Sequence, residues 1–244
     1  MRLHRFIAKL DLTKDNIVIN DVRIVHQVKN VLRLKKGEEI ILSDGNLNEA
    51  SFQIEAIGKT IGGKITNKWI NQNEPKIHTS LYCSILKREN FELVAQKATE
   101  VGVSEIIPII STRTIKQGIK LDRLNKIALE AAEQSGRGIV PKILEPLDFK
   151  QCLIRAQNNQ FSILFDLTGT SIIEAAQSLL LYSGISQIDI FIGPEGGWDE
   201  LELELARKNK FWIVNLGKLT LRAETAAIIS SYLITKIGAP SSDG

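Results

Sequence analysis

Residues 191–200 read FIGPEGGWDE and join an expected strand to an expected helix. The apolar run before them ends at Ile192, and Gly193-Pro194-Glu195-Gly196-Gly197 follow before Trp198 opens the helix. Glycine lets the backbone adopt positive φ angles or approach a ligand closely, whereas proline fixes φ and removes a hydrogen-bond donor. The stretch therefore predicts either a tight turn or a loop against which a ligand packs.

Strands and helices alternate on both sides of this loop. The expected strands are 77–86, 105–110, 161–165, 187–192 and 211–216, and the expected helices are 91–101, 121–135, 171–180, 199–208 and 222–237. Such alternation is typical of an α/β protein whose parallel sheet is covered by helices on both faces. Ligands of open parallel sheets bind at the carboxyl ends of the strands, where the glycine-rich loop lies.

The first 75 residues have a different pattern. Short runs rich in Ile and Phe predict strands at 5–10, 39–42, 51–57 and 61–70, with one helix around 22–34. SDGN at 43–46 predicts a hairpin turn, because glycine tolerates the positive φ that such turns need. This pattern predicts a small β barrel, and NQNEP at 71–75 predicts a linker. We therefore expect two domains, residues 1–75 and 76–244.

The composition is that of a globular protein, with 43% hydrophobic and 24% charged residues among 244. Cys83 and Cys152 stand far apart, and the three histidines are scattered, so we expect buried thiols and no metal site. No run reaches the roughly 18 apolar residues of a membrane span, and the N-terminus lacks the apolar run of a signal peptide. These features predict a cytoplasmic protein without a membrane partner.

Positive charge is concentrated at the N-terminal end. Residues 1–36 contain 9 Lys and Arg against 3 Asp and Glu, whereas residues 76–244 contain 19 of each. A basic end on a neutral body suits a module that binds a polyanion such as nucleic acid. A solvated charged surface is the alternative interpretation.

A second loop, NLGKLTLRAET at 215–225, follows the expected strand 211–216 and leads into the last helix. It brings Arg222, Glu224 and Thr225 to the start of that helix. Taken alone, Glu224 and Thr225 are explained by helix capping, and the first loop by a plain turn. The spacings of dinucleotide-binding and phosphate-binding glycine loops are absent from the first loop.

Together the two loops resemble the C-terminal signature of SPOUT RNA methyltransferases, and more closely that of the 16S ribosomal RNA (uracil-N3) methyltransferase, or RsmE, family. Four further stretches resemble family blocks: HRF at 4–6, HQVKNVLRLKKGEEIILSDG at 26–45, QKATEVGVSEIIPIISTRT at 96–114 and EAAEQSGRGIVPKI at 130–143. Gln27, Glu38 and Thr112 replace the family's His, Asp and Glu, which affects details of the RNA-facing surface.

The resemblance implies an N-terminal PUA-like β barrel, a SPOUT-type parallel sheet with a C-terminal trefoil knot, and a homodimer. It implies S-adenosylmethionine as the cofactor and N3 of a specific uridine in the decoding region of 16S rRNA, in the small ribosomal subunit, as the target. The implied cofactor-binding residues are Phe165, Asp166, Ile192, Gly193, Pro194, Glu195, Gly196, Gly197, Asn215, Leu216, Gly217, Leu219 and Leu221.

Uridine N3 carries a proton at neutral pH and becomes a good nucleophile only when that proton leaves. We expect Arg222 to orient the base or stabilise charge, Glu195 or Glu224 to accept the proton, and Thr225 to hold one of these carboxylates. The expected RNA-binding residues are Arg5, Arg23, Lys29, Arg33, Lys35, Lys36, Arg113 and Arg137, which would contact phosphates or the target strand.

Three other functions fit parts of the pattern. One is methylation of a ribose 2′-OH or of another RNA base, against which only the family-specific N-terminal blocks argue. The second is an RNA-binding or ribosome-assembly factor without catalytic activity. The third is an enzyme that binds a nucleotide phosphate at the glycine loop, which lacks the Lys and Ser/Thr of a phosphate loop.

Overall fold

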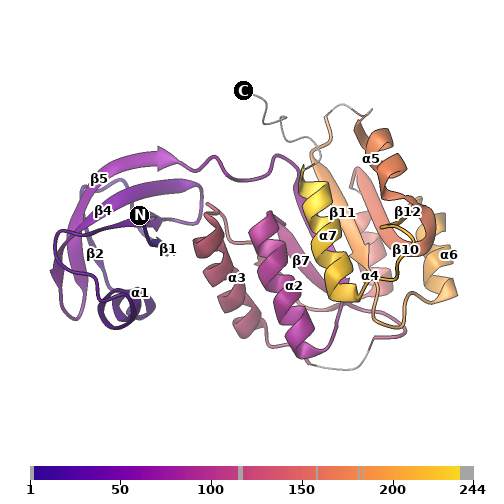
Figure 1. The fold of residues 1–244 in the computed structure, drawn as a ribbon, viewed down its shortest axis with the longest axis horizontal. Coiled ribbons are helices and arrows are strands. Elements are labelled where there is room, and N and C mark those ends of the chain that lie inside the picture. Colours follow the sequence, from indigo (N-terminus) through magenta and orange to yellow (C-terminus); the bar gives the residue numbers. More distant parts are fainter. Residues whose placement is uncertain (1–2, 115–117, 158, 181, 183, 237–244) are drawn as a thin grey trace. The chain divides into compact units, whose positions relative to one another are not determined.

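The computed structural model describes residues 3–114, 118–157, 159–180, 182 and 184–236 (Figure 1). The chain forms two compact units, Met1–Glu74 with Ala132–Val140 and Pro75–Ala131 with Pro141–Gly244. Residues 132–140 thus belong to the first unit, although they follow the start of the second unit in the sequence. The expected division into two domains, residues 1–75 and 76–244, stays a prediction.

The first unit is built on a five-stranded sheet of order β1-β3-β4-β5-β2. Its strands are β1 (Arg5–Ile7), β2 (Asn16–Ile19), β3 (Glu39–Ser43), β4 (Asn48–Ile57) and β5 (Ile61–Ile70). The pair β1–β3 is parallel and the other pairs are antiparallel. Gly45, with a φ of 77°, lies in the expected turn between β3 and β4. Isoleucine, leucine and phenylalanine side chains such as Ile40, Phe52 and Ile54 form its core.

The helix expected around 22–34 is shorter and less regular than predicted. It consists of α1 (Val22–His26) followed by one π-helical stretch, Gln27–Val31. Asp21 caps α1, because its carboxylate accepts hydrogen bonds from two main-chain N–H groups. The π turn ends the helix, and Arg33 then adopts a positive φ of 54°.

The second unit contains a parallel sheet of order β12-β10-β11-β6-β7-β8, with β9 also paired to β7. Its strands are β6 (His78–Ser84), β7 (Glu105–Ile110), β8 (Lys142–Ile143), β9 (Leu147–Asp148), β10 (Phe161–Ser171), β11 (Gln187–Ile192) and β12 (Trp212–Asn215). Every pair in it is parallel, which confirms the expected sheet type.

Helices cover both faces of this sheet, as predicted. The helices are α2 (Arg88–Val101), α3 (Leu121–Ser135), α4 (Phe149–Ala156), α5 (Ile172–Leu180), α6 (Glu200–Lys208) and α7 (Ala223–Lys236). On one face, α2 and α7 pack side by side (Figure 1). Their side chains join those of α3 and α5 in one apolar core. On the other face, α4 and α6 enclose a second core that includes Tyr82, Phe191 and Trp198.

Helix α4 was not predicted from the sequence. It begins with a reciprocal capping arrangement, in which Asp148 accepts from the Gln151 main chain and Gln151 accepts from the Asp148 main chain. Both cysteines are buried and unpaired, as expected. In the part of the chain that the structure describes, no helix is long and apolar enough to cross a membrane. The trefoil knot that the resemblance implies stays a prediction.

Candidate functional site

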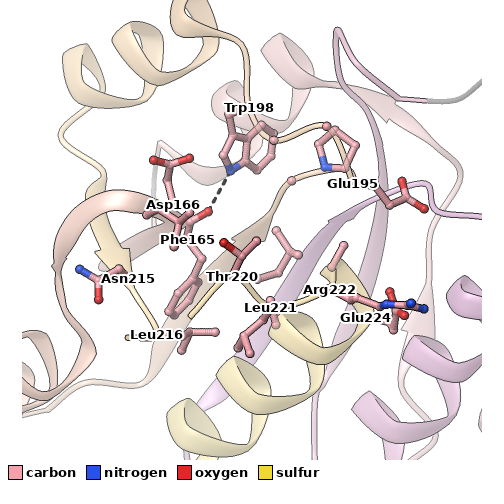
Figure 2. Close-up of a pocket in the computed structure, with 18 of the residues that line it drawn as sticks. Phe165, Asp166, Glu195, Trp198, Asn215, Leu216, Thr220, Leu221, Arg222 and Glu224 are labelled. Carbon is pink, nitrogen blue, oxygen red and sulfur yellow. Dashed lines mark hydrogen bonds between the residues drawn. The ribbon is translucent and has the colours of Figure 1, made fainter. Parts of the chain in front are cut away.

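Three neighbouring strands of the parallel sheet are aligned at Phe165, where β11 ends and the pairing of β10 with β12 becomes irregular. Phe165 of β10 pairs with Ile192 of β11 on one side and with Val214 of β12 on the other. Because the strands are parallel, the irregular part of β10 after Phe165 and the loops after β11 and β12 meet at one edge of the sheet. These loops line a cavity of about 810 Å³, which Figure 2 shows in close-up. This is the size of a small-molecule or cofactor pocket.

With one exception, the residues predicted to bind the cofactor line this cavity. Those that line it are Phe165, Asp166, Ile192, Gly193, Pro194, Glu195, Gly196, Gly197, Asn215, Leu216, Leu219 and Leu221. Gly217 does not line it; with a φ of 123°, it allows the turn between the lining residues Leu216 and Leu219. Asn215 holds this turn, since its side chain donates to Gly169 and accepts from the Gly217 N–H. The roles of these residues in binding stay predictions.

The lining combines an apolar wall with acidic side chains. Aromatic and aliphatic side chains, including those of Phe165, Ile192 and Leu216, provide a surface suited to a flat heterocycle. Asp166, Glu195 and Glu224 add three carboxylates. Lys87 and Arg222 add two cations, so the cavity suits a ligand that has an aromatic part and groups of both charges.

The glycine loop serves a packing purpose that the sequence did not reveal. Trp198 is buried, and its indole Nε1 donates a hydrogen bond of 3.1 Å to the main-chain oxygen of Phe165. A Cβ atom at position 193 would lie 3.1 Å from this indole ring. Gly193 thus allows Trp198 to pack closely against the loop, and the bond joins the β11 loop to β10.

The remaining glycines of the loop have two different roles. Gly197 has a φ of 70°, and its N–H donates to the Pro194 oxygen over 2.9 Å, so residues 194–197 form the expected tight turn. Gly196 lacks a positive φ, and a Cβ atom there would meet only Arg113 at ordinary contact distance. The loop is therefore both a turn and a bare surface beside the cavity.

Arg113 holds this loop, and its predicted contact with RNA stays a prediction. Its Nη1 donates to the Gly196 oxygen over 3.0 Å, and its Nη2 lies 3.3 Å from Asp199 Oδ2. The neighbouring Thr112 donates through its N–H to Glu202, which also completes the capping box of α6 with Asp199. The turn after β7 thereby positions the glycine loop, a link that sequence spacing could not reveal.

The predicted catalytic residues occupy different environments. Glu224, in the first turn of α7, is 8% exposed, and its Oε2 atom is buried without a hydrogen-bond partner among the described residues. Glu195 and Arg222 also line the cavity but are exposed, whereas Thr225 does not line it. Burial and the charges of Glu195 and Glu224 raise the pKa of the Cys83 thiol beneath them.

Two polar residues of the cavity were missed by sequence reasoning. Lys87 and Asn90, at the start of α2, line it together with the three loops. The strand before them, β6, lies next to β11, with Cys83 paired to Ile192. No motif marks these residues; only the strand order, which a sequence pattern does not provide, places them here.

Comparisons with known proteins agree with this arrangement. The sequence model of the RNA methyltransferase domain matches residues 72–235, and that of the RNA methyltransferase PUA domain matches residues 19–61. A ribosomal RNA small subunit methyltransferase E of Mesomycoplasma hyopneumoniae is 38% identical over 191 residues, which are 76% of this chain and 80% of that relative. The chain belongs to the ribosomal RNA small subunit methyltransferase E family.

Other members of the methyltransferase E family match almost the whole chain. The Rickettsia conorii protein is 33% identical over 95% of this chain and 91% of its own length. The solved Neisseria gonorrhoeae structure, described as bound to S-adenosyl methionine, has a TM-score of 0.85 at 29% identity and covers 96% of this chain and 98% of its own. The expected family and the SPOUT-type fold with a PUA-like domain are thereby confirmed.

Within residues 1–36 of this methyltransferase E family member, the basic residues expected to bind RNA divide into two groups. Lys29, Arg33, Lys35 and Lys36 are exposed on the first unit. Arg5 forms an ion pair with Glu49 over 3.1 Å, and Arg23 forms one with Glu133 over 2.8 Å. The first group is free to meet phosphates, whereas the second contributes to the structure of the unit.

Arg137 was expected to contact RNA, but the structure buries it. Only 4% of it is exposed, and its guanidinium pairs with Glu74 over 2.7 Å. Glu74 also accepts from the main-chain N–H groups of Gly138 and Ile139. A buried arginine in such a network anchors residues 132–140 to the first unit and does not present its charge to RNA.

Proposed function

We propose that this protein transfers a methyl group from S-adenosylmethionine to N3 of a specific uridine in the decoding region of 16S rRNA, in the small ribosomal subunit. The observation that carries the proposal is the cavity at the carboxyl ends of β10, β11 and β12 in a member of the methyltransferase E family. A relative 38% identical to this chain is named ribosomal RNA small subunit methyltransferase E. The Neisseria gonorrhoeae relative, 29% identical, is described as bound to S-adenosyl methionine.

The residues of the cavity fit the cofactor. The apolar wall of Phe165, Ile192 and Leu216 suits an adenine ring, and the bare backbone of residues 193–197 permits close approach. The carboxylates suit the positive charges of the amino group and the sulfonium. When bound, the cofactor supplies a methyl group on a positively charged sulfur, which makes that methyl electrophilic.

Glu224 is the better candidate for the proton acceptor. It lines the cavity, is nearly buried and has an oxygen without a hydrogen-bond partner among the described residues. Glu195 is exposed, so water screens its charge and competes for its oxygens. In this account Glu224 takes the N3 proton, and Arg222 holds the base or stabilises the negative charge on the carbonyl oxygens beside N3.

The exposed lysines and arginine of the first unit hold the RNA by its phosphates. Lys29, Arg33, Lys35 and Lys36 all lie between residues 29 and 36, within a segment matched by the PUA domain. Contacts of this kind position the RNA and depend on salt, but they do not read its sequence. Base selection then falls to the cavity.

The protein also acts as a cytoplasmic homodimer in this proposal. Helix α7 exposes Ile229, Tyr232 and Leu233, whose spacing of three and four residues makes one apolar stripe. Exposed apolar stripes of this kind are typical of surfaces that pack against a partner. Sedimentation of the purified protein tests this part: a single monomeric species at micromolar concentration would contradict it.

The proposed reaction is tested with methyl-labelled S-adenosylmethionine, the purified protein, and either unmodified small subunits or naked 16S rRNA. Digestion of the RNA to nucleosides identifies the product. We expect label in 3-methyluridine alone. Label in a 2′-O-methyl nucleoside or in another base would establish a different specificity, and the absence of label would support a binding factor without catalytic activity.

A further inference from the structure

The loop between β6 and α2 brings a free cation to the cavity. Lys87 lines the cavity, its side chain is exposed, and it forms no ion pair among the residues that the structure describes. The adjacent Arg88 does not line the cavity and pairs with Glu92 over 3.1 Å. Lys87 and Arg88 are neighbours in the sequence, but only Lys87 lines the cavity.

Figure 2 shows Glu195, Arg222 and Glu224 together on one side of the cavity, which we call its polar side. Phe165 and Leu216 lie on the other side, with Asp166 and Asn215 beside them. Phe165 and Leu216 suit the adenine of the proposed cofactor. On the polar side, the charged tail of the cofactor is the one part of it that would bind, which leaves room there for the substrate base.

Lys87 and Asn90 belong with this polar side. Their loop follows β6, and the pairing of Cys83 with Ile192 places the end of β6 beside the start of the glycine loop. Both residues lie at the first turn of the 14-residue helix α2, with Lys87 at its N-cap position. The N-terminal end of a helix carries partial positive charge, which adds to that of the ammonium group.

We propose that Lys87 and Asn90 form the subsite for the target uracil, with the Lys87 ammonium against a carbonyl oxygen beside N3. This rests on the proposed function, because it names the part of the site that holds the substrate base. Removal of the N3 proton spreads negative charge over the two flanking carbonyl oxygens, and an ammonium group placed directly against one of them stabilises that charge. Asn90 supplies an amide that donates to the same edge of the base.

The subsite also explains a preference for uracil over cytosine. An ammonium group only donates hydrogen bonds, so it fits the carbonyl oxygens of uracil. Cytosine presents an amino donor where uracil has the O4 acceptor, and that donor would face the cation. With its ammonium group against O4, Lys87 selects uracil as well as stabilising its anion, whereas O2 is common to both bases.

Methyl transfer requires one proton acceptor and one leaving group, and Glu224 and the cofactor sulfur fill these two roles. The N3–H bond breaks and its proton goes to Glu224, while Lys87 keeps its own proton. The new N3–carbon bond forms as the methyl–sulfur bond breaks, and the sulfur keeps that electron pair as a neutral thioether. Lys87 only stabilises the charge that appears on the uracil oxygens between these events.

The test compares Lys87→Gln, Lys87→Arg and the charge-matched control Arg88→Gln. Single-turnover methylation is measured with saturating unmodified small subunits and S-adenosylmethionine between about pH 6.5 and pH 9. We expect Lys87→Gln to be about 100-fold slower near pH 7, with a deficit that shrinks as the pH rises. Lys87→Arg restores most of the rate, Arg88→Gln keeps it, and cofactor affinity is unchanged in all three.

Three outcomes would overturn the subsite. They are a rate deficit in Lys87→Gln that is the same at every pH, a change confined to the KM for the small subunit, or behaviour identical to that of Arg88→Gln. Asn90→Ala gives a second readout, expected as about a tenfold loss of rate with normal cofactor binding. Absence of N3 methylation by the wild-type protein would instead refute the proposed function itself.

Discussion

The indole Nε1 of Trp198 donates a hydrogen bond of 3.1 Å to the main-chain oxygen of Phe165. The two residues are 33 positions apart; Phe165 belongs to strand β10 and Trp198 to the loop after β11, and both line the cavity. The bond, drawn as a dashed line in Figure 2, therefore ties the middle of β10 to the glycine loop after β11. Two walls of the site are positioned by a side chain with no predicted catalytic or binding role.

Replacing Trp198 with Phe should weaken both the fold and the site. The Phe165 carbonyl would lose its buried partner, which costs about 1–3 kcal/mol of unfolding free energy. Urea unfolding measures this loss, and titration with S-adenosylmethionine measures the loss of affinity that should accompany it. Trp69→Phe is the control: it removes an indole bond to Glu49 in the first unit and should leave cofactor affinity unchanged.

Gly193 and Gly196 should respond differently to alanine. At position 193 the new methyl would press on Trp198 at 3.1 Å, so Gly193→Ala should lower stability by about 1–3 kcal/mol. At position 196 the methyl has room, so Gly196→Ala should keep its stability and lose only cofactor affinity. Equal stability of the two variants in urea unfolding would contradict the packing role of Gly193.

The choice of proton acceptor can be tested with a matched pair of variants. Glu224→Gln should lower the single-turnover methylation rate about 100-fold or more, because the buried base is lost while its shape is kept. Glu195→Gln should stay within the same order of magnitude as the wild type, since Glu195 is exposed. If both variants turn over at near-normal rates, neither carboxylate is the base.

Buried Asp189 should make stability depend on pH. Burial raises the pKa of its carboxyl to about 6, although Asn159 donates a hydrogen bond to the charged form and Arg155 lies nearby. The folded state then binds this proton more tightly than the unfolded chain, so stability falls as pH rises from about 4 to 6.

The size of this effect follows from the shift in pKa. The penalty above pH 6 is roughly 3 kcal/mol at about 1.4 kcal/mol per pKa unit. Asp189→Asn removes it, so urea unfolding should show a larger gain from this substitution at pH 8 than at pH 5. A gain that is equal at both pH values would show that Asp189 does not titrate in this range.

The exposed basic residues of the first unit should control the salt dependence of RNA binding. The double replacement Arg33→Ala and Lys35→Ala should raise the KM for RNA and reduce the slope of log affinity against log salt by roughly 1.5 to 2. Lys59→Ala with Lys64→Ala removes the same charge from exposed positions of the same unit and serves as the control. An unchanged salt slope in the first variant would refute its phosphate contacts.

The strands and loops of the site were predictable because their sequence signals are local. The run ending at Ile192, the glycines after it and the helix from Glu200 all fall where the pattern places them. Helix α4 was missed, since eight residues with apolar positions at 149, 152, 153 and 156 make only two turns. Its capping box became visible only with the structure.

Contacts between distant residues could not be predicted. Arg113 and Arg137 look like free cations in the sequence, but their partners Asp199 and Glu74 lie 86 and 63 positions away. Lys87 looks like one basic residue among many, and only the order of strands places it at the cavity. Residue type and spacing therefore predict which loops form the site, and the fold decides which charges remain available.

The central claim is methylation of uridine N3, and reverse transcription across 16S rRNA tests it most directly. Unmodified small subunits are incubated with the purified protein and S-adenosylmethionine, and the rRNA is then copied with a primer near its 3′ end. A methyl group on N3 blocks the pairing edge of uridine, so the account predicts one new stop at a single uridine in the decoding region. Methyl label in the rRNA without any new stop would contradict it.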